Sequence, residues 1–354
     1  MNRGRAPGNF AQASTLRCPF VPWPRPPARG AAAPVDLVPG QCEEPFLCII
    51  TGANRGVGLK ATEKYAAAGY EVIMACRDQT KAEDAISGIK RTNPDAKLTF
   101  MKLDLASLKS VRQFVDEFHA AAKPLHVLCN NAGMTTGFRN GKGPFKTEDG
   151  FEVTFGINHL GHFLLTLLLL DDLKKTASEA GEARIVVTAS SLHDPDSIKG
   201  MRAPGAHLDF DNLQLLEGPY NGELAYKNSK LANVLFTKEL ARRLGESGVT
   251  VNALCPGFIP STGLIRNESS MKRFMLTKVL YPMFKWKGIT RTEIQGGESV
   301  YHAGTDPNLK GKTGGYYRDC KETESSVESN DTAVAKKLWD VSAQMVNLEE
   351  EKNL

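Results

Sequence analysis

The sequence predicts an α/β fold built on a single Rossmann-type doubly wound parallel β-sheet that is flanked by helices. Three observations predict it: apolar runs of strand length alternate with longer runs of helical periodicity, a glycine-rich turn follows the first run, and no internal repeat or second domain is evident. The chain has 354 residues, of which 41% are hydrophobic and 24% charged, which is ordinary for a globular protein.

Six runs are nearly continuous in apolar residues, which is typical of parallel strands that are buried on both faces. The predicted strands are Phe46–Thr51, Tyr70–Cys76, Leu98–Leu103, His126–Cys129, Ala183–Ala189 and Val249–Leu254. The predicted helices between them are Leu59–Ala68, Lys81–Lys90, Leu108–Ala122, Phe151–Lys175 and Ala225–Leu244. Ser107 directly precedes one of these helices and is a suitable N-cap. Right-handed crossovers between such units build a doubly wound sheet.

The composition changes near residue 45. Residues 1–45 are rich in Pro, Ala and Arg and poor in acids, so they are interpreted either as an organelle transit peptide or as a disordered tail. The first alternative places the protein in a plastid or mitochondrion, and the second in the cytoplasm. Residues 46–348 are predicted to form the folded domain, with a substrate lid at about 258–292, and residues 349–354 to form a short tail.

Charge, cysteine content and hydropathy exclude several classes of protein. A net charge of +4 is too small to indicate nucleic-acid binding. The seven cysteines include no C-x-x-C pair, so neither a metal site nor a disulfide framework is expected. No run reaches the ~18 consecutive apolar residues of a membrane span. The longest candidate, Phe163–Leu170, contains Thr166 and is predicted to be a buried helix.

A glycine-rich turn, TGANRGVG at Thr51–Gly58, joins the first strand to the first helix. Glycine lets the backbone turn tightly and approach a pyrophosphate without a Cβ in the way. The N-terminus of the following helix offers unpaired N–H groups and a positive dipole end to the phosphates. We therefore predict a Rossmann-type dinucleotide site, and its expected contacts here are Gly52, Asn54, Arg55, Gly56, Val57 and Gly58.

The end of the second strand indicates NADPH rather than NADH. An NAD site usually places an acid here to bind the ribose hydroxyls, whereas an arginine suits a 2′-phosphate. This chain has Cys76 followed by Arg77, and Arg55 in the glycine turn adds a second cation. Asp78 follows at once and keeps NADH open as the alternative.

Tyr226 and Lys230 lie four residues apart on a predicted amphipathic helix, so they share one face. A free tyrosine has a pKa near ~10, too high for an efficient base at neutral pH. A neighbouring ammonium and a cationic nicotinamide ring would lower that pKa. We expect Tyr226 to be the proton donor or acceptor and Lys230 to be its electrostatic partner.

Ser190 and Ser191 follow the fifth strand, at the sheet edge where ligands bind in open α/β folds. A serine hydroxyl there can orient a substrate carbonyl oxygen. Ser191 is the preferred assignment and Ser190 the alternative. The G-x-S-x-G elbow of a serine hydrolase, the rival chemistry, is absent from this stretch.

Asn158 lies on the long predicted helix after the fourth strand. Its amide is expected to hold a water molecule and to extend a proton path to Lys230. His159 and His162 follow it without an evident third metal ligand, so they are interpreted as packing residues.

The remaining expected cofactor contacts follow other strand ends. An acid and the residue after it are placed to meet the adenine, a small Ala-Gly step lets the cofactor lie close to the backbone, and a Pro-Gly step lies near the nicotinamide. These contacts are Asp104, Leu105, Asn131, Ala132, Gly133, Pro256, Gly257 and Ile259, besides Tyr226 and Lys230.

These motifs, in this order and at this spacing, resemble those of short-chain dehydrogenases/reductases over about 46–348. The stretches NHLGHFLL and AYKNSKLANVLFTKELARRL resemble retinol dehydrogenases and the related WW-domain oxidoreductase. The stretches VIMACRD and PGFIPSTGLIR resemble light-dependent protochlorophyllide reductase. That reductase carries a cysteine directly after the Pro-Gly step, where this chain has Phe258, and a longer loop between the serine and the tyrosine. The anchoring N-terminal helix common among retinol dehydrogenases is not found here.

The resemblance implies NADP(H)-dependent hydride transfer to or from a bulky apolar carbonyl or alcohol, with Asn158, Ser191, Tyr226 and Lys230 as catalytic residues. The alternatives are light-dependent reduction of a double bond and, in another class, a non-catalytic NADP-binding regulatory protein. The aromatic and methionine-rich part of 258–292 is expected to cover the substrate. Its basic residues between 271 and 287 suggest, as an alternative, contact with an anionic membrane surface.

Overall fold

The computed structural model describes residues 45–137, 143–196, 205–260 and 290–348, all of which belong to one compact unit of the chain. The expected N-terminal tail before residue 45 and the C-terminal tail 349–354 lie outside the described residues. So do 261–289, which include most of the expected lid and the whole basic segment 271–287.

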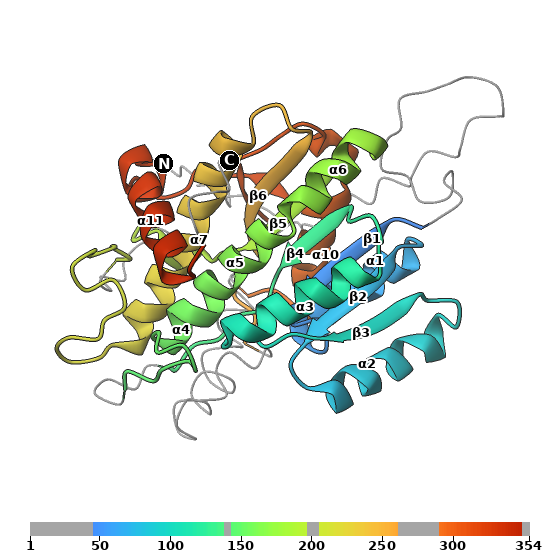
Figure 1. Ribbon diagram of the computed structural model, residues 1–354, viewed down its shortest axis with the longest axis horizontal. Coiled ribbons are helices and arrows are strands. Elements are labelled where there is room, and N and C mark those ends of the chain that lie inside the picture. Colours follow the sequence, from blue (N-terminus) through green and yellow to red (C-terminus); the bar gives the residue numbers. More distant parts are fainter. Residues whose placement is uncertain (1–44, 138–142, 197–204, 261–289, 349–354) are drawn as a thin grey trace, which may run out of the picture. The chain divides into compact units, whose positions relative to one another are not determined.

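The sheet has the predicted doubly wound topology (Figure 1). Its strands lie in the order β3-β2-β1-β4-β5-β6-β7-β8, and all neighbours pair in parallel except β7 and β8. The strand order reverses between β1 and β4, and ligands bind beside such a switch point. The strands are β1 (Leu47–Thr51), β2 (Glu71–Cys76), β3 (Leu98–Lys102), β4 (Val127–Asn130), β5 (Ala183–Thr188), β6 (Val249–Cys255), β7 (Tyr316–Arg318) and β8 (Lys321–Glu322).

Helices cover both faces of the sheet, and each face has its own hydrophobic core. On β1, Ile49 faces one core while Cys48 and Ile50 face the other, as strand alternation requires. One face is covered by α3 (Leu108–Ala120), α5 (Gly161–Leu168), α6 (Leu170–Ala180), α7 (Gly222–Leu244) and α11 (Thr332–Met345). The other face is covered by α1 (Gly56–Ala67), α2 (Gln79–Thr92) and α10 (Glu293–Thr305). The hydroxyl of Ser107 caps α3 as predicted, because it accepts the N–H of Ser110.

The single helix predicted over Phe151–Lys175 is broken in the structure. It consists of α4 (Val153–Phe155), a π-helical turn at Gly156–Leu160, α5 and α6, with a bend of 53° between Val153–Leu168 and Leu170–Ala180. A Cβ at Gly161 would lie 2.7 Å from the carbonyl oxygen of Leu105, so only glycine permits this close approach to the loop after β3. Isolated π-turns of this kind are frequent at functional sites.

Among the described residues, no single helix is both long enough and apolar enough to cross a membrane. The bent pair of α4–α5 with α6 meets that criterion only as a pair, by length and composition. The side chains of Phe163, Leu164 and Leu165 in this pair are buried in the core, as predicted for 163–170.

Candidate active site

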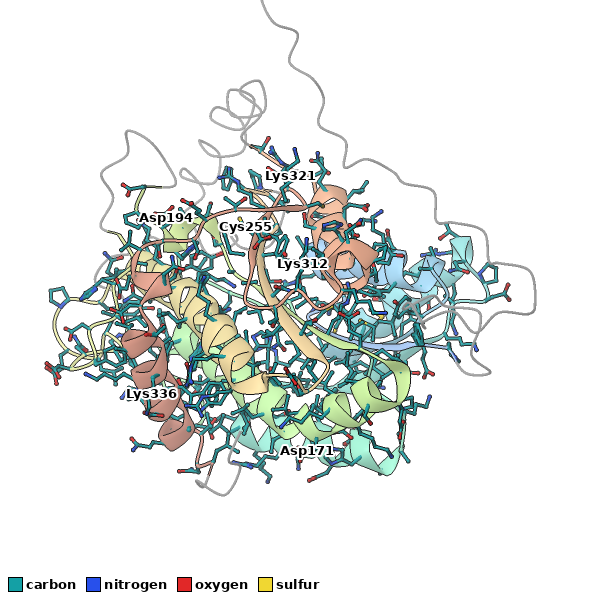
Figure 2. The ribbon with its side chains drawn as sticks, turned by 90° about the horizontal axis from the view of Figure 1, so that it is seen from above. Asp171, Asp194, Cys255, Lys312, Lys321 and Lys336 are labelled. Carbon is teal, nitrogen blue, oxygen red and sulfur yellow. The ribbon has the colours of Figure 1, made fainter. Side chains whose placement is uncertain are left out.

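The predicted site residues gather at one edge of the sheet, because each follows the carboxyl end of a parallel strand or starts the helix beside it. β1, β2, β3, β4, β5 and β6 each contribute, and α7 contributes Tyr226 and Lys230. Figure 2 shows Cys255 at the end of β6, on the same side as Asp194, which follows the serines after β5.

The glycine turn has the tight geometry that a pyrophosphate cradle requires. Gly52 and Gly56 adopt left-handed φ angles of 66° and 56°. A Cβ at Gly58 would lie 2.4 Å from the carbonyl oxygen of Gly52, so the helix start packs directly on the turn. α1 begins at Gly56, and the side chain of its N-cap residue Arg55 makes no capping hydrogen bond. The first backbone N–H groups of the helix can therefore bind an anion.

The end expected to hold the adenosine brings two arginines to the edge of β2. The Cys76 thiol accepts backbone hydrogen bonds from Ala53 and Asn54, and the charge of Arg55 acts on it. Arg77 is largely exposed, and its guanidinium lies 3.9 Å from the carboxylate of Asp104. Asp104 also accepts the N–H of Ala106 at 3.0 Å, which orders the turn after β3.

Asp78, which left NADH open, has its carboxylate committed elsewhere. It is the N-cap of α2, where it accepts the N–H of Lys81 at 3.1 Å and pairs with the Lys81 ammonium. A carboxylate that caps a helix and neutralises a lysine competes less for ribose hydroxyls.

The turn after β4 is held against the glycine turn by Thr51. Its hydroxyl accepts the backbone N–H groups of Asn131 and Ala132, both at 2.9 Å, and its carbonyl accepts the Asn131 amide at 2.9 Å. The Cα of Ala132 would lie 3.1 Å from a Cβ at Gly52, so the two turns touch. A Cβ at Gly133 would meet Asn158 Oδ1 and Lys230 Nζ, each at 3.5 Å. The small residues expected here therefore line the floor between the two turns.

The structure brings Ser190, rather than the preferred Ser191, to the phenol of Tyr226. The Ser190 side chain hydrogen-bonds the Tyr226 hydroxyl. Ser190 also accepts the N–H of Leu192 at 3.2 Å and caps the short 3-10 turn Ser191–His193. Ser191 instead uses its backbone N–H to bond the Cys255 sulfur at 3.2 Å. The contact of its hydroxyl with the Tyr226 phenol favours Ser190, the alternative assignment of the orienting serine.

Lys230 is buried on α7, where only 2% of its surface is exposed. Its Nζ donates to the carbonyl oxygen of Thr188 at 2.9 Å and lies 5.8 Å from the centre of the Tyr226 ring. An ammonium has three donors, so further donors remain for a ribose hydroxyl or a water molecule beside Gly133.

Among the described residues, the expected lowering of the Tyr226 pKa by Lys230 is not seen. Burial raises the pKa of Tyr226 well above its ordinary value of 10, the Cys255 thiol raises it further, and only the Ser190 hydroxyl lowers it. Burial also lowers the pKa of Lys230 to about 8, against an opposing effect of Cys255, so the ammonium still carries most of its charge at neutral pH. Tyr226 is therefore a neutral phenol at physiological pH, ready to donate a proton.

The depressed pKa of Lys230 predicts how stability depends on pH. The unfolded chain still binds this proton between pH 8 and 10.5, where the folded chain has lost it, so the unfolding free energy rises with pH in that window. The full rise is about 3 kcal/mol. Urea unfolding of the cofactor-free Lys230→Met protein at several pH values up to 10 should lack this rise. The substitution of the exposed Lys336, Lys336→Met, should leave the rise as large as in the wild-type protein. An equal rise in the wild-type protein and in both variants would contradict this expectation.

Asn158 lies in the π-helical turn, and its side-chain amide makes three hydrogen bonds within the protein, which leave one lone pair of Oδ1 for the water molecule expected there. Its Oδ1 accepts the N–H of Met134 at 2.8 Å, and its Nδ2 donates to the Met134 carbonyl at 2.9 Å and to Ser229 Oγ at 3.0 Å. Ser229 in turn donates to the carbonyl oxygen of Tyr226 at 2.7 Å. The side chain of Asn158 thus ties the turn after β4 to α7.

The expected nicotinamide end is an apolar wall at the start of α10. A Cβ at Gly296 would lie 2.6 Å from Ile259 Cδ1, 2.8 Å from Val57 Cγ2 and 3.5 Å from Pro256 Cβ, so these three predicted residues converge on one glycine. Gly257 has φ of 89° and packs on the stem of Arg291. Leu105 is buried beneath Gly161, so its backbone is the part near the site.

The model of the short chain dehydrogenase family matches residues 47–199 and 216–273. The chain belongs to the short-chain dehydrogenase family. It is an oxidoreductase of that family, it uses a nicotinamide cofactor, and it acts on a small molecule. The glycine cradle fits such a cofactor, since the left-handed Gly52 and Gly56 turn the backbone tightly before the uncapped N-terminus of α1.

Curated relatives of this short-chain dehydrogenase are retinol dehydrogenases and a plastid protein. It is 40% identical over 314 residues to human retinol dehydrogenase 14, with 85% of this chain and 86% of the relative covered. It is 39% identical over 321 residues to human retinol dehydrogenase 13, with 90% and 88% covered. It is also 39% identical over 303 residues to short-chain dehydrogenase TIC 32 B, chloroplastic, of Brassica napus, with 84% and 88% covered.

Solved structures share the fold. An uncharacterized protein from Mycobacterium Paratuberculosis has a TM-score of 0.64 and 28% identity, with 88% of this chain and 96% of that chain covered. An NADPH-bound short-chain oxidoreductase from Pseudomonas aeruginosa has a TM-score of 0.58 and 19% identity, with 77% and 94% covered.

Several residues of the site were not predicted from the sequence. Thr51 holds the turn after β4, the carbonyl of Thr188 binds Lys230, and Gly296 backs the nicotinamide end. Thr51 alone had a usable signal, because a threonine that ends a buried strand beside a glycine turn has a hydroxyl to bond. The other two depend on tertiary contacts that no local pattern shows.

Proposed function

We propose that this short-chain dehydrogenase uses NADP(H) to interconvert a bulky apolar carbonyl compound and the corresponding alcohol. The observation that carries the proposal is the cluster of Ser190, Tyr226 and Lys230 at the sheet edge beside the glycine cradle. The names of the retinol dehydrogenase relatives support an apolar carbonyl or alcohol as the substrate class.

Within this proposal, each residue of the cluster has one task. Ser190 orients the substrate oxygen by its hydroxyl, in place of Ser191. Tyr226 donates the proton to that oxygen, since burial keeps its phenol neutral. Lys230 binds the nicotinamide ribose and stabilises the phenolate left after proton donation. The bound NADPH supplies the hydride.

The side chain of Asn158 holds the turn after β4 against α7 by its hydrogen bonds to Met134 and Ser229. Its backbone carbonyl, rather than its amide, is then the group that a relay water would bind. The lid remains part of the proposal: the bridge between Phe258 and Thr290 brings the two ends of 261–289 together beside Gly257.

The preference for NADPH is supported by Arg55 and Arg77, which follow the ends of β1 and β2, and by the commitment of Asp78 to α2. Arg77→Ser should weaken NADPH binding by about 10- to 100-fold, the loss expected for one charge-assisted hydrogen bond, and leave NADH binding nearly unchanged. Equilibrium titration with both cofactors measures the two dissociation constants.

Arg91→Ser is the matched control, since it removes an equal charge from the exposed end of α2. It should change neither dissociation constant. Tighter binding of NADH than of NADPH by the wild-type protein would refute the cofactor assignment.

A further inference from the structure

His162 lies on α5 with 3% of its surface exposed, four residues after Asn158. Its Nδ1 lies 3.1 Å from the backbone carbonyl oxygen of Asn158. Its Nε2 lies 2.9 Å from the hydroxyl oxygen of Thr51. The ring therefore bridges the π-helical turn that carries Asn158 and the strand end that begins the glycine turn. A packing residue, as the sequence suggested, needs neither contact.

The hydrogen bonds of Thr51 decide where the proton of His162 lies. The Thr51 hydroxyl already accepts two N–H groups, those of Asn131 and Ala132 at 2.9 Å each, so both of its lone pairs are used. It must donate its own hydrogen, and His162 Nε2 at 2.9 Å is closer than the Cys129 carbonyl oxygen at 3.3 Å. Nε2 is then the acceptor and Nδ1–H is the donor to the Asn158 carbonyl.

The surroundings of His162 keep the ring in this neutral form. Burial lowers its pKa to about 4, the bond to the Asn158 carbonyl opposes this, and the charge of Lys230 lowers it further. His162 thus bonds the Asn158 carbonyl as a neutral ring.

We propose that His162 is a positioning residue that fixes the direction of the Asn158 carbonyl by its Nδ1–H and ties that carbonyl, through Thr51, to the turns that hold the cofactor. The inference rests on the proposed function, in which this carbonyl meets the proton relay of Lys230. One N–H bond leaves the carbonyl a single lone pair for a relay water. Loss of that bond frees the carbonyl to turn and lengthens the proton path.

Two substitutions separate the two contacts of the ring. The amide of asparagine can place a donor where Nδ1 lies, whereas the longer glutamine reaches the position of Nε2. His162→Asn should therefore keep most of kcat, although it loses the Thr51 contact. His162→Gln should lose at least about tenfold in kcat, the scale of a misplaced catalytic group, with KM for the carbonyl substrate little changed. The solvent deuterium isotope effect on kcat should rise in His162→Gln.

His159 provides the matched control, because it is a buried histidine in the π-helical turn just before α5. It packs among Phe155, Phe163 and Phe236, and its Nε2 bonds Ser342 on α11 at 2.9 Å. His159→Asn and His159→Gln should both lower stability. The two variants should have the same kcat and the same solvent deuterium isotope effect. Equal kcat losses in the Asn and Gln variants of His162 would overturn the proposal.

A second readout does not need turnover. Nitrogen-15 spectra of the full-length protein labelled at histidine report which ring nitrogen carries the proton, and His162→Asn assigns the signal. We expect a proton on Nδ1, none on Nε2, and no titration across neutral pH. A proton on Nε2 would overturn the inference even in an active enzyme. If the wild-type protein turns over no carbonyl substrate but shows the Nδ1–H form, the proposed function fails and the positioning geometry stands.

Discussion

The Tyr226→Phe protein is expected to lose about 10²–10⁴-fold in kcat, the usual contribution of a positioned acid or base. The change removes one oxygen, which the Ser190 hydroxyl bonds in the wild type, and leaves the ring on α7 in place. The dissociation constant for NADPH should be unchanged, because the glycine cradle and Lys230 remain. Single-turnover reduction of a lipophilic aldehyde, with NADPH binding measured in parallel, tests both expectations.

Tyr301→Phe is the matched control for this change. Tyr301 is partly buried on α10, across the sheet from α7, where its ring packs edge-on against Tyr65. Its substitution should leave kcat at the wild-type value. Turnover by Tyr226→Phe at the rate of Tyr301→Phe would show that another group donates the proton.

Gly58→Ala should weaken NADPH binding. The added Cβ would lie 2.4 Å from the Gly52 carbonyl oxygen and 2.6 Å from Asn131 Nδ2, so the glycine turn and the turn after β4 must both shift. Overpacking of this kind costs about 1–3 kcal/mol, and if that cost falls on the cradle the dissociation constant rises by about 5- to 150-fold. Calorimetric titration of NADPH into the full-length protein measures the change.

Gly88→Ala offers a contrasting glycine on α2. A Cβ there would meet only Arg91 Nη2, at 3.7 Å, so it fits without movement. Helix propensity predicts a gain of about 0.5–1 kcal/mol in stability and no change in NADPH affinity. Wild-type affinity in the Gly58→Ala protein would mean that the cradle is not where the cofactor binds.

The fold was predictable because burial on both faces leaves a continuous apolar run at each central strand. All six predicted strands are present, with ends shifted by about one residue, the usual uncertainty of such boundaries. β7 was not predicted because three residues are too short for a period to show. α11 was missed although Asp331 signals its start by capping Ala333 and Val334.

The site was predictable at the level of motifs but not of atoms. Ser190 and Ser191 are neighbours at a strand end, where successive side chains point to opposite sides. The sequence therefore does not decide which of the two contacts Tyr226. The break of the long helix at Gly156–Leu160 was not predicted, nor were the hydrogen bonds of the Asn158 amide to Met134 and Ser229. Burial, which a motif does not reveal, set the pKa of Tyr226 in the cofactor-free protein.

Transfer of deuterium from labelled NADPH to the product tests hydride transfer more directly than the rate of NADPH consumption does. The wild-type protein is incubated with NADPH that carries deuterium at nicotinamide C4, prepared in both stereochemical forms, and with a panel of lipophilic aldehydes, ketones and retinoids in light and in dark. We expect an alcohol product that holds one deuterium on the former carbonyl carbon, from one form of NADPH and without any need for light. Absence of deuterium from every product, or its appearance at a reduced double bond only under illumination, would contradict carbonyl reduction at Tyr226.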